Sequence, residues 1–290
     1  MKIIQIIKKR KRQESKVMNI LYNFIWILLS YLIGSVNFSI IFTKYNLNKD
    51  IRKVGSGNAG STNVARVYGF KLGLIVFILD VSKSYWLGFI AGMLQRYVGA
   101  FSGLIPQLCL MFVIIGHIFP IYFGFKGGKG AAALFGMVSA ISLILAVVGI
   151  IIFSIIVYYS KYVSLGSIIT PFILVFVSFL IPFWNHLDSP INYGPFWLTP
   201  LFLFISWLIV ASSHWQNILR LIKKTESKTS LKILLSKEKQ NKTNTQEVDY
   251  ANINTEEITD VSKINYNKTF QKKDLSILEE ASSNDSKFNS

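Results

Sequence analysis

The sequence predicts an all-α, polytopic helical membrane protein with about seven transmembrane helices. Hydrophobic residues make up 51% of the chain and aromatic residues 14%, and a helix needs roughly 20 apolar residues to cross a bilayer. Six apolar runs approach or exceed that length, at residues 17–42, 70–94, 100–123, 131–159, 162–183 and 196–211. A cleaved signal peptide does not explain six such runs, so the chain is expected to cross a membrane repeatedly.

The distribution of basic residues between the apolar runs predicts the orientation. The loop at residues 44–71 holds six basic residues, whereas Asp188 is the charged residue of the loop at 184–195. Because positively charged loops remain in the cytoplasm, the Gly-rich polar loops are expected to converge at the cytoplasmic face. The run 131–159 would be ~43 Å long as one helix, well beyond a ~30 Å hydrocarbon core. Two short helices that turn near residues 139–142 or Gly149 give seven spans and return the chain to the cytoplasm.

The two ends of the chain differ in composition from the part between them. Residues 1–17 contain the basic cluster KKRKR and are expected to form an N-terminal extension, with translation starting at either Met1 or Met18. Residues 18–224 are expected to form the transmembrane domain. Residues 225–290 hold 10 Lys and 11 acidic residues, with few aromatic residues and no sustained apolar period. Such a composition favours a disordered polar tail.

Composition excludes several functional classes. Cys109 is the single cysteine and lies in an apolar run, and His117, His186 and His214 lack the spacing of metal ligands. Neither a disulfide framework nor a metal site is therefore expected. The net charge is +16, but the excess of basic residues lies beside the membrane segments, where it attracts anionic lipid headgroups. Nucleic-acid binding would need a soluble basic face, which the sequence lacks.

Two loops rich in glycine and basic residues suggest anion binding. In VGSGNAGSTN, residues 54–63, glycine lets backbone N–H groups approach a ligand closely, and such groups form an anion-binding concavity. Arg52 adds a planar fork suited to phosphate. The loop FKGGKG adds Lys126 and Lys129 but does not fit a Walker A pattern. The alternatives are a helix-capping loop for the first stretch and an ordinary basic turn for the second.

Polar residues within the apolar runs are a third feature. Asp80 and Lys83 are three residues apart on one predicted helix, so they can pair. Charges within a span suggest function, although an ion pair that satisfies itself is the alternative. His117 and His214 could act as bases or as hydrogen-bond donors to phosphate, and a purely structural hydrogen bond is the alternative for each.

These motifs, in their order, resemble the bacterial acyl-phosphate:glycerol-3-phosphate 1-acyltransferase family. The resemblance runs from about residue 18 to residue 226 and is carried by GSVNFSIIFTK, DIRKVGSGNAGSTNVARVYG, LDVSK, GHIFPIYFGFKGGKGAAA, KYVSLGS and HWQNILRLIKKTE. It implies a seven-helix enzyme of the bacterial inner membrane with its active site facing the cytoplasm. This enzyme would transfer an acyl chain from acyl phosphate to the 1-hydroxyl of glycerol 3-phosphate, making lysophosphatidic acid for phospholipid synthesis.

The resemblance also implies site residues and partners. Catalytic roles are implied for Asn58, His214 and Asn217. Substrate-binding roles are implied for Ser35, Arg52, Gly55, Ser56, Gly57, Gly60, Thr62, Asn63, Lys83, His117, Lys126, Gly127, Gly128, Lys129, Gly130, Ser164, Ser167 and Arg220. No cofactor and no covalent nucleophile are implied, and either the donor's own phosphate or a histidine would accept the hydroxyl proton. The implied partners are the two substrates, membrane lipid and the soluble enzyme that makes acyl phosphate from acyl carrier protein.

The chain departs from the family's pattern at a few positions, and one other function fits its loops. Asn37 stands where the family usually has Pro, and Lys224 where it usually has Gly. The alternative function is a membrane transporter of an organic phosphate, which would use the same loops without chemistry. A transporter predicts an internal repeat and polar residues through the membrane depth. The sequence shows no such repeat, and its polar motifs cluster toward one face.

Overall fold

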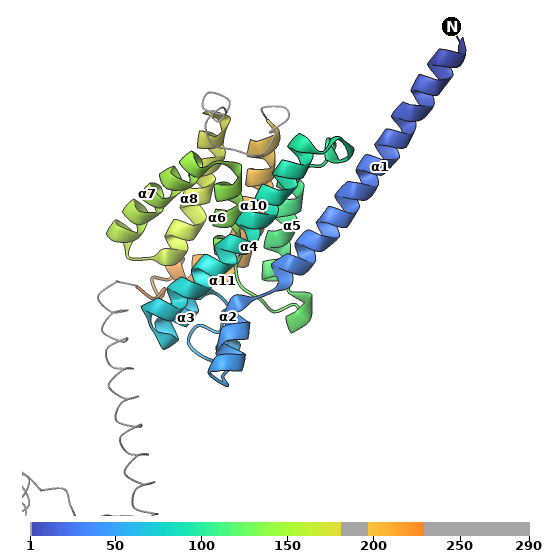
Figure 1. The fold of residues 1–290 in the computed structure, drawn as a ribbon. Coiled ribbons are helices and arrows are strands. Elements are labelled where there is room, and N and C mark those ends of the chain that lie inside the picture. Colours follow the sequence, from blue (N-terminus) through green and yellow to red (C-terminus); the bar gives the residue numbers. More distant parts are fainter. Residues whose placement is uncertain (1, 181–196, 229–290) are drawn as a thin grey trace, which may run out of the picture. The chain divides into compact units, whose positions relative to one another are not determined.

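The computed structural model describes residues 2–180 and 197–228, and in these two ranges the regular structure is entirely helical (Figure 1). The remainder of the expected tail lies outside the described residues. The longer helices are α1 (Lys2–Ser35), α4 (Phe70–Tyr97), α5 (Pro106–Ile118), α7 (Leu143–Ser160), α8 (Val163–Val177) and α10 (Leu198–Ser213). The shorter ones are α2 (Phe38–Ile41), α3 (Ser61–Tyr68), α6 (Ala131–Ile141) and α11 (Trp215–Ile222).

The protein is a polytopic membrane protein. Five stretches of the described chain are long and apolar enough to cross a bilayer: Lys16–Asn46, Phe70–Tyr97, Pro106–Phe123, Leu143–Ser160 and Val163–Leu180. Helices α10 and α11, which meet at an angle of 64°, make a sixth span if the bent pair counts as one. Helix α6 has 11 residues, or ~16 Å of rise, which is too short to cross alone. The expected count of seven spans is therefore not confirmed.

A single residue separates α6 from α7. Ser142 has an extended backbone (φ −156°, ψ 126°), and its hydroxyl accepts a hydrogen bond from the Leu145 N–H at 3.2 Å. This contact caps the start of α7, as serine commonly does. The expectation that residues 131–159 fold as two helices that turn near residues 139–142 is confirmed.

The first helix runs without a break from Lys2 to Ser35, and the membrane-spanning stretch begins at Lys16. The separate extension expected for residues 1–17 stays a prediction. Helix α1 packs along α5, α4 packs against α3 and α6, and α8 packs between α7 and α10. Buried apolar side chains of α5, α6, α8 and α10 form the main core, among them Leu110, Met137, Leu174 and Leu203. These contacts fix the relative positions of the helix ends that carry the polar motifs.

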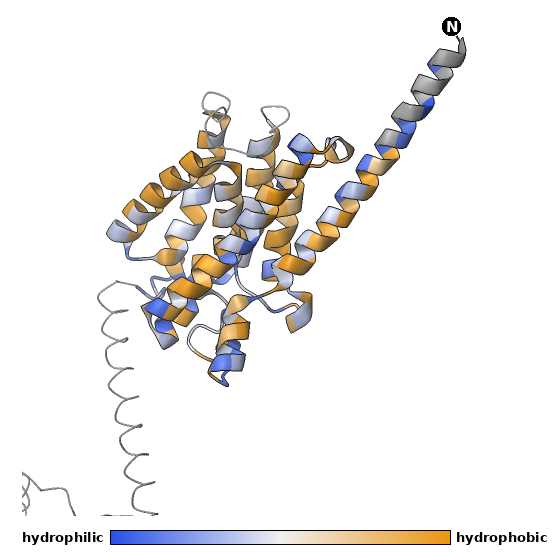
Figure 2. Ribbon diagram, in the orientation of Figure 1, coloured by the Kyte–Doolittle hydropathy of each residue, from blue (hydrophilic) through white to orange (hydrophobic). Residues whose placement is uncertain are grey.

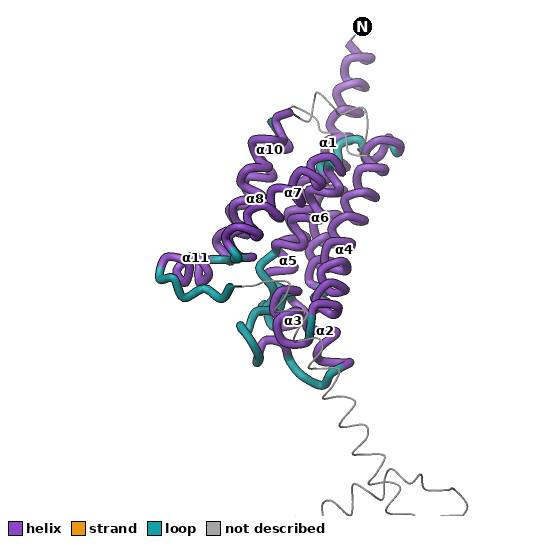
Figure 3. Tube along the Cα trace, turned by 90° about the vertical axis from the view of Figure 1, so that its left-hand side faces the viewer, coloured by secondary structure: helices purple, strands orange, loops and turns teal. Residues whose placement is uncertain are grey.

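The polar motifs lie toward one end of the helix bundle. Helices α2, α3 and α11 are found at this end in Figure 1, and the view turned by 90° places them there again (Figure 3). The hydropathy colouring shows hydrophilic segments at the same end and apolar segments along the helices (Figure 2). The Gly-rich loops therefore converge, as the sequence predicts.

Candidate active site

A polar pocket of about 290 Å³ lies where four helices begin. Helices α3, α6, α8 and α11 each contribute first-turn residues to its wall. No side chain of the described residues caps any of these four N-termini by a hydrogen bond. The first N–H groups of a helix have no partner within the helix, and the helix dipole gives this end a partial positive charge. Four helix N-termini around one pocket favour a strongly anionic ligand.

Three cationic side chains, Arg66, Lys129 and Arg220, also line the pocket. The Lys129 ammonium donates a hydrogen bond to Asn217 Oδ1. Burial lowers the pKa of Lys129 from 10.5 to about 8; Arg220 and Arg66 lower it as well, whereas Glu226 raises it. At neutral pH the ammonium is still charged, so the pocket combines helix N-termini with three positive charges.

Glu226 connects the elements around these cations. Its Oε1 accepts hydrogen bonds from Asn217 Nδ2 at 2.6 Å and Ser164 Oγ at 2.9 Å, and its Oε2 accepts one from Arg220 Nε at 2.7 Å. Burial alone would raise the pKa of Glu226, but these hydrogen bonds outweigh burial and lower it. The carboxylate thus holds α8 and α11 in place.

The expected domain boundary after Lys224 falls inside this site. Thr225, Glu226 and Ser227 all line the pocket. Lys224 adopts a left-handed backbone (φ 56°), and the Thr225 and Glu226 N–H groups donate to the Arg220 carbonyl. This turn brings the chain back over α11, so the first residues of the expected tail belong to the site.

Asn63 holds the first Gly-rich loop in its conformation. Its Nδ2 group lies within 3.0–3.3 Å of the carbonyl oxygens of Ile51, Val54 and Asn58, and its Oδ1 accepts from the Ser56 N–H at 2.8 Å. Gly55 has φ 62°, and a Cβ there would clash with Asn63 Oδ1, so glycine is required. The Asn63 amide is used within the loop, which leaves Ser56 and Asn58 facing the pocket.

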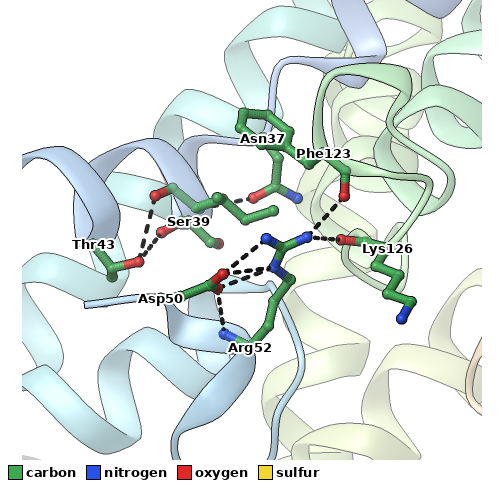
Figure 4. A network of polar contacts seen from close by, with 8 residues as sticks. Asn37, Ser39, Thr43, Asp50, Arg52, Phe123 and Lys126 are labelled. Carbon is green, nitrogen blue, oxygen red and sulfur yellow. Dashed lines mark hydrogen bonds and ion pairs between the residues drawn. The ribbon is translucent and has the colours of Figure 1, made fainter. Parts of the chain in front are cut away.

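Arg52 joins the two Gly-rich loops to each other (Figure 4). Its Nη2 donates to Asp50 Oδ2 at 2.8 Å, and its Nη1 donates to the Phe123 carbonyl at 2.8 Å and, more weakly, to that of Lys126 at 3.4 Å. The hydrogen bonds from Arg52 lower the pKa of Asp50 to about 2. Arg52 does not line the pocket. In this structure the guanidinium links the two loops, and the phosphate contact expected for Arg52 from the sequence stays a prediction.

The second Gly-rich loop packs on the end of α5. The Gly127 and Gly128 N–H groups donate to the carbonyls of Ile118 and His117, each at 3.1 Å. A Cβ at Gly128 would clash with His117 Nε2, so only glycine permits this approach. Lys126 is exposed, and the loop contributes Lys129 and Gly130 to the pocket.

A buried polar cluster lies below the pocket. Lys83 Nζ donates to the Gly34 carbonyl at 3.1 Å, the Val36 carbonyl at 2.7 Å and Asp80 Oδ1 at 2.8 Å. Because an ammonium group has three protons, these oxygens use all of them. His117 Nδ1 lies 3.1 Å from Lys83 Nζ and 3.4 Å from Asp80 Oδ1. Asp80 and His117 line the pocket, whereas Lys83 does not.

His214 is oriented by its own helix. Its Nδ1 lies 2.8 Å from the Val210 carbonyl oxygen. A carbonyl can only accept, so Nδ1 carries the proton, and the neutral ring keeps Nε2 as an acceptor. His214 lines the pocket beside Asn217.

All 21 site residues expected from the sequence lie in the described part of the chain, and 13 of them line the pocket. The lining set is Ser56, Asn58, Gly60, Thr62, Asn63, His117, Lys129, Gly130, Ser164, Ser167, His214, Asn217 and Arg220. Outside it are Ser35, Arg52, Gly55, Gly57, Lys83, Lys126, Gly127 and Gly128. Sequence reasoning missed Arg66, Asp80 and Glu226, although Arg66 stands in the first motif and Asp80 was recognised as a charge within a span.

A second, apolar pocket of about 490 Å³ adjoins the polar one. Its wall comes mainly from apolar side chains of α4, α6, α7 and α8, such as Phe77, Phe135, Phe153 and Leu174. Seven residues line both pockets and mark their junction: Ser61, Thr62, Arg66, Ala131, Ala132, Val163 and Ser167. The site thus joins an anion-binding chamber to a chamber suited to a hydrocarbon chain.

Comparison with known proteins supports one family. A family model described as glycerol-3-phosphate acyltransferase matches residues 24–224. A glycerol-3-phosphate acyltransferase of Mycoplasma mobile is 49% identical over 218 residues, which cover 71% of this chain and 91% of that protein. One of Mycoplasmopsis pulmonis is 41% identical over 212 residues, which cover 71% of this chain and 93% of that protein.

Solved structures agree. A crystal structure of PlsY, an integral membrane glycerol 3-phosphate acyltransferase, in its glycerol 3-phosphate form matches with a TM-score of 0.60 and 29% identity, covering 74% of this chain and 98% of that chain. The lysophosphatidic acid form of PlsY matches with a TM-score of 0.58 and 28% identity over the same shares. Most of the pocket-lining residues fall within the segment that the family model matches.

Proposed function

Because the chain belongs to the glycerol-3-phosphate acyltransferase family, we propose that it transfers an acyl chain from acyl phosphate to the 1-hydroxyl of glycerol 3-phosphate. The product is lysophosphatidic acid for phospholipid synthesis. The observation that carries this proposal is the junction of a cationic pocket, where four helices begin, with an apolar pocket. Both substrates carry phosphate, and the donor also carries a hydrocarbon chain, so the two chambers match the two chemical parts of the reactants.

The apolar pocket is the place for the acyl chain. Burying hydrocarbon there removes it from water and contributes roughly 0.8 kcal/mol for each methylene group. With the chain in this pocket, the acyl carbonyl lies at the junction, where Arg66 and the starts of α3, α6 and α8 meet. The donor phosphate then lies in the polar pocket.

The reaction needs positioning and charge stabilisation, not a covalent intermediate. The 1-hydroxyl oxygen attacks the acyl carbonyl carbon, the bond from this carbon to the phosphate oxygen breaks, and inorganic phosphate leaves. Cations and helix N-termini stabilise the negative charge on the carbonyl oxygen and on the leaving phosphate. Binding both reactants side by side supplies proximity.

Two groups compete for the hydroxyl proton. The leaving phosphate can accept it directly, which balances the reaction without a protein base. His214 Nε2 is the other acceptor, because Nδ1 carries a proton toward Val210. We favour the donor phosphate, with His214 holding a substrate oxygen by a hydrogen bond. The amide of His214→Gln can still form a hydrogen bond with that substrate oxygen. The variant should therefore show nearly the same pH dependence of turnover as the wild type.

The same proposal includes location and partner. Basic loops gather with the polar pocket, and such loops favour the cytoplasm, so we place the site at the cytoplasmic face of the bacterial cell (inner) membrane. A soluble enzyme that makes acyl phosphate from acyl carrier protein would supply the donor there. With Cys109 replaced by Ala, Lys126→Cys should react with a membrane-impermeant thiol reagent only when the reagent has access to the cytoplasmic side. Gly99→Cys, in the turn before α5, should react from outside; the reverse pattern contradicts this orientation.

Activity of the purified protein tests the function directly. Incubation with palmitoyl phosphate and glycerol 3-phosphate should yield lysophosphatidic acid and inorganic phosphate in equal amounts. Palmitoyl-CoA in place of palmitoyl phosphate is the control and should yield little. Failure with acyl phosphate in a well-folded preparation, or efficient use of acyl-CoA alone, would reject the proposed donor.

A further inference from the structure

Asp80 has one carboxylate oxygen that no described residue contacts by a hydrogen bond. The residue lies on α4, is fully buried and lines the polar pocket. Its Oδ1 accepts the hydrogen bond from Lys83 at 2.8 Å. Its Oδ2 is also buried and has no hydrogen-bond partner among the described residues. Since all three Lys83 protons go to other oxygens, Lys83 cannot supply a second donor.

A buried carboxylate oxygen without a donor is unfavourable, because burial removes water and leaves the charge partly unpaired. A charged side chain within a membrane span is costly, so its presence there indicates a function. A donor that enters from the pocket would satisfy Oδ2. Glycerol 3-phosphate offers two hydroxyl hydrogens for this purpose, whereas its phosphate is repelled by a carboxylate.

The charges of the pocket orient such a ligand. Arg66, Lys129 and Arg220 attract the phosphate, whereas the Asp80 carboxylate, beside His117 in the same wall, repels it. Asp80 lines the polar pocket but not the apolar one. The attacking hydroxyl must reach the junction of the two pockets, where the acyl carbonyl lies. The hydroxyl that meets Asp80 is therefore the other one.

We propose that Asp80 Oδ2 accepts a hydrogen bond from the 2-hydroxyl of glycerol 3-phosphate and so determines specificity for a glycerol acceptor. This inference rests on the proposed function. It makes Asp80 a substrate-contacting residue, and it makes Lys83 and His117 positioning residues that hold its carboxylate. The 1-hydroxyl then remains free to face the acyl donor.

The test uses 3-hydroxypropyl phosphate, which keeps the phosphate and the primary hydroxyl but lacks the 2-hydroxyl. A hydrogen bond to a charged group corresponds to roughly 10- to 150-fold in an equilibrium constant. The wild-type protein should therefore acylate this analogue with a kcat/KM lower by roughly that factor than for glycerol 3-phosphate. Equal use of both acceptors by the wild-type protein would overturn the inference, whatever any variant does.

Asp80→Asn provides the second arm. Lys83 Nζ is a donor, so the amide oxygen of the variant should face Lys83 and its NH₂ group should face the pocket. The variant should lose most of its activity with glycerol 3-phosphate but little more with the analogue, so the preference between acceptors nearly disappears. An equal loss with both acceptors would mean that Asp80 acts only through folding, and the inference would fail.

Ser84→Ala is the matched control. Ser84 lies one turn further along α4, is fully buried, and its Oγ likewise has no partner among the described residues, but it does not line the pocket. Its preference between the two acceptors should equal that of the wild type. The two proposals fail differently: a wild-type protein that makes no lysophosphatidic acid refutes the proposed function, whereas an active protein indifferent to the 2-hydroxyl refutes only the role of Asp80.

Discussion

Raising the pH should weaken substrate binding through Lys129. Burial lowers the pKa of this ammonium to about 8, so it loses its charge in a range where an exposed lysine keeps it. At pH 9, roughly one tenth of the molecules would retain the charge. The value of kcat/KM for glycerol 3-phosphate, which reports on the enzyme form that binds this substrate, should therefore fall roughly tenfold between pH 7 and pH 9. The substrate phosphate does not interfere, because its second pKa is about 6.

Lys129→Arg separates this charge from other causes. A guanidinium stays protonated throughout the range of the assay, so the variant should show a nearly flat profile from pH 7 to pH 9.5. Its activity at pH 7 should be lower than that of the wild type, because a planar fork does not reproduce the ammonium contact with Asn217. Lys126→Arg, in the same loop but exposed and outside the pocket, is the control and should keep the wild-type profile.

The assay is the initial rate of lysophosphatidic acid formation at saturating palmitoyl phosphate, with donor hydrolysis in the absence of enzyme subtracted at each pH. Binding of phosphate raises the pKa of Lys129, so kcat should depend on pH less than kcat/KM does. A flat wild-type profile would refute the reasoning. So would a Lys129→Arg profile that falls with the same apparent pKa as the wild type.

Three further changes test other parts of the structure. Arg52→Ala should raise both Michaelis constants to a similar degree and destabilise the protein by about 1–3 kcal/mol, seen as a lower midpoint of thermal unfolding in detergent; a rise in only one constant would indicate direct contact with one substrate. Gly149→Leu narrows the apolar pocket and should reduce kcat/KM roughly tenfold or more for a long-chain donor but much less for a ten-carbon one. Thr170→Val keeps the volume of the same pocket and should leave chain preference unchanged. Lys224→Gly removes a left-handed non-glycine residue and should stabilise the protein by about 1 kcal/mol, and a lower unfolding midpoint would contradict this.

The lengths of the apolar runs made the helical membrane fold largely predictable from the sequence. The turn at Ser142 follows from comparing the length of an apolar run with the thickness of a bilayer, and the cap that Ser142 forms by accepting from the Leu145 N–H agrees with it. The count of spans was harder, because α6 is apolar throughout yet has only 11 residues. Composition identifies a helix as apolar, but it does not say whether a short helix crosses the membrane or ends within it.

The site was less predictable, because a motif does not show where a side chain points. Arg52 and Arg66 stand at the two ends of one motif, and only Arg66 lines the pocket. The carboxylate of Asp50, two residues before Arg52, was a local indication that this guanidinium forms an ion pair within the protein. Its hydrogen bond to the Phe123 carbonyl could not be predicted from the sequence, because Phe123 is 71 positions away in the chain. Glu226 was not predicted as a site residue, because the polar composition of residues 225–290 assigned it to the expected disordered tail.

The two departures noted from the family's usual pattern also have structural explanations. Asn37, where Pro is usual, caps α2 by accepting from the Ile40 N–H at 3.0 Å. Its Nδ2 donates to the Ala59 carbonyl at 3.2 Å and so ties α2 to the first Gly-rich loop. Lys224, where Gly is usual, adopts the left-handed conformation that glycine adopts without strain. The first departure adds a contact, and the second retains a backbone shape at an energetic cost.

The shared wall of the two pockets also affects how the product departs. Leu74 and Ile150 line the apolar pocket and are 42% and 51% exposed. Both lie in membrane-spanning stretches, so acyl tails of the bilayer are the surroundings expected for their exposed surface. On the proposed function, lysophosphatidic acid formed at the junction would move sideways into the leaflet, chain first. Leaving through water would expose each methylene group at a cost of roughly 0.8 kcal/mol, or about 8 kcal/mol for ten of them. Turnover in detergent should for this reason depend on whether the micelle offers the product an apolar phase beside α4 and α7.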